Sequence, residues 1–154
     1  MSGSDAKEGR LAARAIVLGP GEGRKVPGRE SVTLKATSEQ TGGSVGFIEA
    51  TSEPGEGPSP HIHRDCDELF YVLEGEFDFL VGGETVRAPA GSFVFVPKGT
   101  VHAARSVGAG TGRVLAAYVP AGAEGAFEAF AQASPEERDG VAERYDSEFV
   151  KVQW

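Results

Sequence analysis

Short apolar runs, each closed by glycine or proline, recur at about ten-residue spacing through most of this chain. The expected strands are, in order, 13–19, 31–37, 44–51, 68–75, 76–83, 84–91, 92–99, 101–108 and 113–120. The 22 glycines and 9 prolines fit many tight turns, and the pair Gly82 and Gly83 predicts a hairpin. This pattern predicts an all-β fold, a sandwich or barrel, rather than parallel strands alternating with helices.

Beyond residue 121 the pattern becomes helical. Apolar side chains recur at helical spacing in two segments, at Phe127, Phe130 and Ala131 and then at Val141, Tyr145 and Phe149. Ser134 is a candidate N-cap, with Pro135 at the first helical position and Glu137 completing a capping box. We expect two short helices that pack on the outside of the barrel or cover its mouth. The predicted divisions are a flexible N-terminus at 1–10, a β-barrel at 11–121 and a helical extension at 122–154.

Charge and cysteine content exclude several classes of partner. The formal net charge of −8 argues against nucleic acid and anionic membrane surfaces, which are bound by clustered Lys and Arg. Cys66 is the single cysteine, so no intrachain disulfide forms. The sequence has neither the central apolar segment of a signal peptide nor about eighteen consecutive apolar residues. We therefore expect a cytoplasmic protein that is not a membrane protein.

Two of the three histidines stand one residue apart in "PHIHRDCDELFYVLEG". Side chains at i and i+2 of an extended strand point to the same face, so His61 and His63 can direct two imidazoles at one point. Glu68 follows the turn-like "RDCD" and opens the next strand, so its carboxylate can return to that point. The third histidine, His102, begins a later strand after a turn. Together these residues predict a metal site with three nitrogen ligands and one oxygen ligand.

The two histidine segments resemble the motifs of the cupin superfamily. The first motif, G-x5-H-x-H-x4-E-x6-G, is matched by Gly55, His61, His63, Glu68 and Gly75. The second motif, G-x5-P-x-G-x2-H-x3-N, is matched by Gly91, Pro97, Gly99 and His102. Ser106 stands where asparagine is usual, a change that we expect to affect only packing at the strand's end. The resemblance implies a cupin-type jelly-roll β-barrel with the metal inside, held by His61, His63, Glu68 and His102.

Three neutral imidazoles and one carboxylate leave a divalent ion with a net charge of about +1. An ion with octahedral geometry would then keep roughly two coordination positions open for other ligands. Such positions accept a substrate oxygen beside water or O₂. The expected cofactor is one divalent transition metal ion, either Fe, Mn, Ni, Co, Cu or Zn. A closed structural zinc site is the alternative, and the absence of thiolate ligands from this set disfavours it.

Strand alternation predicts an apolar lining around this site. If Glu68 points inward, Phe70 and Val72 point inward as well. Further candidates for the substrate pocket are Phe77, Phe79, Phe93, Phe95 and Ala104. No Arg or Lys is in phase with the ligands, which disfavours phosphosugars and dicarboxylates and favours a flat, weakly polar aromatic molecule. Apolar residues inside a barrel are also simply what its core requires.

The segments "PHIHRDCDELFYVLEGEFDFLVG" and "GSFVFVPKGTVHA" resemble the small quercetin 2,3-dioxygenase-like cupins. This resemblance implies a dioxygenase of a flavonol-like or other enolic or phenolic molecule, with Glu68 as the catalytic base. Polyketide cyclases and isomerases that work without O₂ are an alternative, and a non-catalytic small-molecule binding protein is another. We interpret Cys66 as an inert thiol. The apolar runs "FYVL" and "FVFV", together with the resemblance, predict a homodimer.

Overall fold

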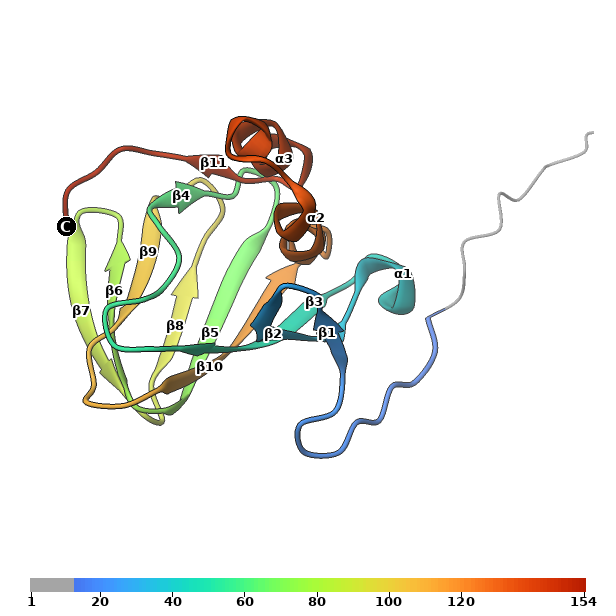
Figure 1. Cartoon of the computed structure of the whole chain (residues 1–154), viewed down its shortest axis with the longest axis horizontal. Helices are drawn as coiled ribbons and strands as arrows, with labels where there is room; N and C mark the ends of the chain where they lie inside the picture. Colours follow the sequence, from blue (N-terminus) through green and yellow to red (C-terminus); the bar gives the residue numbers. More distant parts are fainter. Residues whose placement is uncertain (1–12) are drawn as a thin grey trace, which may run out of the picture.

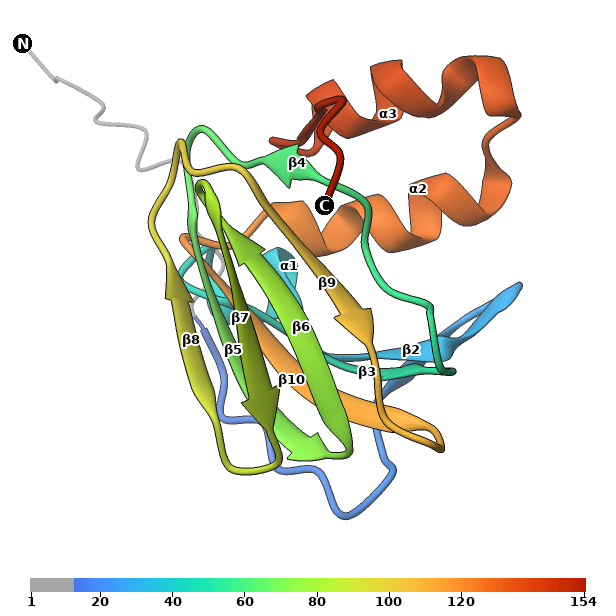
Figure 2. The same ribbon diagram turned by 90° about the vertical axis from the view of Figure 1, so that its left-hand side faces the viewer.

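Two antiparallel sheets face each other in the computed structural model, which describes residues 13–154 (Figures 1 and 2). The first sheet has the order β1 (Arg24–Val26), β2 (Arg29–Ala36), β3 (Gly46–Ser52), β10 (Gly112–Val119), β5 (Asp67–Glu74) and β8 (Phe93–Val96). The second has the order β11 (Glu148–Phe149), β4 (His61–Ile62), β9 (His102–Ser106), β6 (Glu76–Val81) and β7 (Glu84–Pro89). The expected all-β jelly roll with short C-terminal helices is confirmed. The expected flexible terminus at 1–10 lies outside the described residues.

One of the expected strands is absent. Residues 13–19 form no strand, and the side chain of Val17 is 92% exposed, because this apolar run has no partner strand. The other expected strands are present, with ends that shift by at most three residues. The short strands β1 and β11 were not expected, since neither has an alternating apolar pattern.

The core lies between the two sheets. Phe70 and Val72 of β5 and Phe77 and Phe79 of β6 are buried there. Pairing of β5 with β8 sets the phase of β8, since residues directly opposite each other share a face of the sheet. Val94 lies opposite Phe70, so Val94 points inward.

The expectation that Phe93 and Phe95 point into the barrel is therefore wrong. Their side chains lie on the outer face of β8, where they are 61% and 49% exposed. Val96 lies opposite Glu68 and is buried.

The C-terminal extension folds over one end of the barrel (Figure 2). Its elements are η1 (Ala123–Gly125), α2 (Ala126–Gln132), η2 (Pro135–Glu137) and α3 (Arg138–Arg144), while α1 (Ser38–Thr41) lies between β2 and β3. The expected capping box of Ser134 and Glu137 is present. The second helix ends at Arg144, because Asp146 adopts a φ of 57° and turns the chain into β11. Phe149 therefore lies on a strand, and the expectation of a helical stripe that reaches it is wrong.

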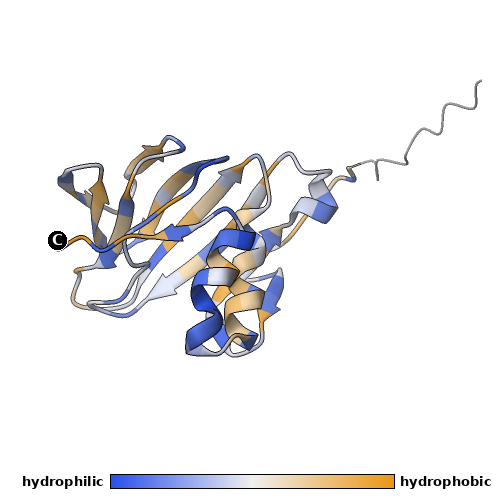
Figure 3. Ribbon diagram, turned by 90° about the horizontal axis from the view of Figure 1, so that it is seen from above, coloured by the Kyte–Doolittle hydropathy of each residue, from blue (hydrophilic) through white to orange (hydrophobic). Residues whose placement is uncertain are grey.

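The two helices differ in character. Figure 3 shows more hydrophilic residues on α3 than on α2, in accord with the sequences "RDGVAER" and "AFEAFAQ". Phe127 and Phe130 of α2 face a cavity that opens into the barrel. The helices thus cover the mouth of the barrel. Within residues 13–154 no helix is long and apolar enough to cross a membrane.

Candidate metal centre

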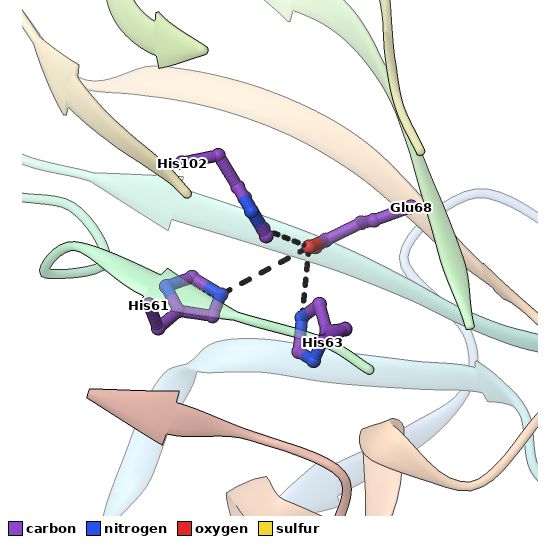
Figure 4. A group of neighbouring side chains, drawn as sticks. All are labelled: His61, His63, Glu68 and His102. Carbon is purple, nitrogen blue, oxygen red and sulfur yellow. Dashed lines mark hydrogen bonds and ion pairs between the residues drawn. The ribbon is translucent and has the colours of Figure 1, made fainter. Parts of the chain in front are cut away.

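Four side chains from three strands and one adjoining loop converge at the inner end of the barrel (Figure 4). His61 of β4 lies directly opposite His102 of β9, and His63 follows β4. Glu68 reaches the same point from β5, on the other sheet. The Oε2 atom of Glu68 lies 4.0 Å from Nε2 of His61, 3.0 Å from that of His63 and 2.7 Å from that of His102. The structure therefore brings together all four of the expected ligands.

Backbone carbonyls orient all three imidazoles. Each Nδ1–H donates to a backbone oxygen, His61 to Ser59 at 2.7 Å, His63 to Asp146 at 2.8 Å and His102 to Thr100 at 2.9 Å. The hydroxyl of Ser147 also lies 3.2 Å from Nδ1 of His63. A carbonyl only accepts, so each Nδ1 carries the proton and a neutral ring presents a bare lone pair at Nε2. All three Nε2 atoms face the carboxylate of Glu68, which is also an acceptor, so the hydrogen bonds from His63 and His102 to Glu68 need a proton on Nε2 as well. The cluster requires a metal ion or protons among these atoms.

The electrostatics of the cluster favour the ligand forms of Glu68 and His61. Burial raises the pKa of Glu68, but hydrogen bonds from His102 and His63 and their charges outweigh it, and the net pKa is well below its usual range. Burial, together with the charge of His102, lowers the pKa of His61 to about 4. Burial also lowers the pKa of His63, but the hydrogen bond to Glu68 and its charge reverse this effect and raise it. A metal ion therefore competes with a proton on His63.

The spacing of the donor atoms fits one metal ion. All four lie within 4.8 Å of one another. With metal–ligand bonds of about 2.0 to 2.2 Å, neighbouring and opposite ligands of one ion are about 3 and 4 Å apart. Imidazole nitrogen with a carboxylate oxygen suits Fe, Mn, Ni, Co, Cu or Zn.

A second candidate set, His63, Cys66 and Asp146, shares one histidine with the first. Cys66 is buried, and burial together with a hydrogen bond to Asp146 raises the pKa of its thiol far above the usual value. A protonated thiol is a poor metal ligand and a poor nucleophile. This buried environment, which keeps the thiol protonated, agrees with the expectation that Cys66 is inert.

A cavity of about 520 Å³ extends from the cluster to the C-terminal helices. Of the expected pocket residues, Phe70, Phe77 and Ala104 line it. Val72 and Phe79 are buried in the core and do not line this cavity. The volume falls in the range of about 300 to 1,000 Å³ that is typical of small-molecule sites.

Several residues of the cavity wall were not predicted. Tyr118 of β10 lies opposite Glu68, and its ring centroid is 5.5 Å from that of His63. Burial, followed by the charge of Glu68, raises the pKa of Tyr118, which keeps it a neutral phenol. Alternation along "RVLAAYV" would have placed Tyr118 inward. Arg29 and Arg138 also line the cavity, and no local pattern places them there.

Ser106, the departure from the second motif, is buried at the far end of β9. Its backbone accepts a hydrogen bond from Gly55 and donates one to Glu56, while its Oγ has no partner among the described residues. This serine therefore belongs to the packing of the barrel and not to the ligand set.

The fold and the cluster define a β-barrel protein with a candidate metal centre at the inner end of a ligand-sized cavity. Residues 48–118 match the family model described as the cupin domain, and this segment contains all four converging residues. The chain therefore carries a match to the cupin domain over these 71 of its 154 residues.

Individual relatives are distant. The chain is 30% identical over 90 residues to quercetin 2,3-dioxygenase of Bacillus subtilis, which covers 58% of this chain and 27% of that enzyme. It is 35% identical over 75 residues to tetracenomycin polyketide synthase protein TcmJ of Streptomyces glaucescens, covering 49% of each chain. The chain thus spans half or less of the length of these two relatives.

A solved structure supports the fold alone. A protein described as a predicted oxalate decarboxylase from Thermotoga maritima superposes with a TM-score of 0.56 at 24% identity. The superposition covers 58% of this chain and 78% of that one.

Proposed function

We propose that this cupin is a metal-dependent dioxygenase of a flavonol-like or other enolic or phenolic small molecule. One observation carries the proposal: three Nε2 lone pairs and the Glu68 carboxylate meet at the inner end of a cavity with apolar walls. A bound divalent ion would polarise a ligand oxygen and support electron transfer to O₂. The distant likeness to quercetin 2,3-dioxygenase is consistent with this chemistry.

The protein's own residues provide the other requirements of the reaction. Phe70, Phe77 and Ile48 form apolar walls that exclude water from a flat ligand. Glu68 is buried, and its lowered pKa by itself makes it a weak base, so it would accept the proton of an enolic hydroxyl only when a bound ion makes that hydroxyl more acidic. Tyr118 offers a neutral hydroxyl donor at the cavity wall. These groups would bind, orient and deprotonate the ligand.

The test is O₂ consumption by metal-loaded protein with a panel of flavonols and other enediols. A dioxygenase consumes one O₂ for each substrate and incorporates both atoms of ¹⁸O₂ into the product. A fully metallated protein that leaves the whole panel unchanged would contradict the proposal.

The second candidate is a polyketide cyclase or isomerase that works without O₂, and the likeness to TcmJ favours it. Turnover of a polyketide substrate under anaerobic conditions would select this candidate over the dioxygenase. Tight ligand binding without turnover in either atmosphere would select a non-catalytic binding protein.

A further inference from the structure

Two arginines lie at the outer end of the cavity, where the C-terminal helices cover the barrel. Arg29 is the first residue of β2 and Arg138 the first of α3, and both are half-buried. Their guanidinium carbons lie 5.9 Å and 4.9 Å from the ring centroid of Phe130, and that of Arg29 also lies 6.0 Å from the ring of Phe127. The cavity joins this end to the histidine cluster.

Neither guanidinium has a carboxylate partner within residues 13–154. By contrast, four other arginines pair with acidic side chains, namely Arg24, Arg64, Arg87 and Arg113. Contact with an aromatic face stabilises the cationic charge but leaves the N–H donors of the guanidinium unused.

The two like charges also repel each other. Burial, followed by the charge of Arg138, lowers the pKa of Arg29. The chain has a net charge of −8, yet no acid among residues 13–154 forms an ion pair with either of these two half-buried cations. An anion held between them would remove the repulsion and accept their N–H groups.

We propose that Arg29 and Arg138 bind a carboxylate of the small molecule whose other end reaches the histidine cluster. This inference deepens the proposed function and rests on it for the direction in which the ligand lies. Guanidinium forks match a planar carboxylate in bidentate fashion. The flanking rings of Phe127, Phe130 and Phe149 suit a flat, delocalised acid. The expected ligand is thus an aromatic carboxylic acid with an enolic or phenolic group at the far end.

The test compares 3-hydroxyflavone-4′-carboxylate with its methyl ester, by titration into wild-type protein and the double variant R29Q/R138Q. The variant removes both charges and leaves shorter, uncharged polar side chains. R24Q is the matched control, since Arg24 pairs with Glu128 outside the cavity wall. Circular dichroism and thermal unfolding check that each variant is folded.

Wild-type protein and R24Q should bind the acid at least about tenfold more tightly than the ester. The preference should fall to about onefold in the double variant. An equal affinity for acid and ester in wild-type protein, or a preference that survives in the double variant, would overturn the inference. A double variant that does not fold is replaced by the single variants R29Q and R138Q, each of which should reduce the preference, and a full preference in both would also count against the inference.

Both titrations are repeated on chelator-treated protein. The preference for the acid should persist without metal, because the arginines and not the cluster provide it. If metal-loaded protein turns over none of the flavonols and enediols while the preference for the acid persists, the dioxygenase is refuted and the carboxylate site is supported. Turnover of a flavonol without any preference for the acid would support the dioxygenase and refute the carboxylate site.

Discussion

The Nδ1–H of His63 donates to the backbone carbonyl of Asp146, 2.8 Å away and 83 residues later in the chain. The Asp146 carboxylate in turn accepts hydrogen bonds from the backbone N–H groups of Arg64 and Asp65, each at 3.0 Å. These bonds hold Asp146 at its positive φ and attach the C-terminal extension to the histidine loop. The extension therefore helps to orient one ligand of the cluster.

Asp146→Ala should weaken metal affinity by about tenfold, because it removes the carboxylate that holds the carbonyl of Asp146 against His63, and orienting groups of a ligand histidine typically contribute this much. Asp146→Asn is the matched control, since it keeps an acceptor oxygen and tolerates positive φ. Affinity is measured by competition with a chelator of known stability constant. Equal affinities for wild type and Asp146→Ala would refute an orienting role.

The stability of chelator-treated protein should depend on pH through His61. The pKa of His61 is about 4 in the folded protein against 6.5 as its ordinary value. The unfolded chain binds more protons between these values, so the free energy of unfolding falls as pH decreases from 6.5 to 4. The loss is about 3 kcal/mol at most.

Glu68, whose pKa is lowered, adds a loss in the same direction at lower pH. His63, whose pKa is raised, loses its contribution as pH increases above 6.5. Urea unfolding at pH 7 and pH 5 measures how much the free energy of unfolding falls in the pH range where His61 titrates. This fall in the free energy of unfolding should be smaller in His61→Gln. A variant with an unchanged difference would exclude His61 as its source.

Gly57→Ala should destabilise the loop that borders the cavity. Gly57 has a φ of 157°, and an added Cβ would lie 2.0 Å from the carbonyl oxygen of Ala104. Backbone must move, at a cost of about 3 kcal/mol. Gly55→Ala is the control, because nothing lies within 4 Å of its Cβ and positive φ alone costs about 1 kcal/mol. Chemical denaturation measures the free energy of unfolding of both variants. Equal losses of this free energy in Gly57→Ala and Gly55→Ala would contradict the clash with Ala104.

The homodimer remains a prediction, and the outer face of β8 is where we expect the contact. Phe93, Phe95 and Tyr71 of the neighbouring strand are exposed there. Replacing both phenylalanines by serine should convert a dimer to a monomer in sedimentation equilibrium, with no loss of metal. A wild-type monomer at micromolar concentration would refute this expectation.

Local pattern predicted the metal cluster well, because its four residues obey strand geometry. His61 and His63 needed only the i, i+2 rule, and His102 stood at the start of an expected strand. The phase of β8 was beyond such a rule, because "FVFV" is apolar on both faces. Only its pairing with β5 decides that Phe93 and Phe95 face outward.

Long-range features could not be predicted from local pattern. Arg29 and Arg138 come together only because both pack against the ring of Phe130 on α2. Asp146 reaches His63 through a turn that interrupts an expected helix. Residues 13–19 show the converse, since a strand-like run without a partner strand stays exposed.

The most direct test of the metal centre is elemental analysis of wild-type protein, His61→Ala and Cys66→Ser after loading with a divalent ion and exhaustive dialysis. Wild type and Cys66→Ser should retain about one ion per chain, and His61→Ala should retain far less, because it loses one of four ligands. Full retention of metal by His61→Ala, or none in the wild-type protein, would contradict the assignment of His61, His63, Glu68 and His102 as a metal site.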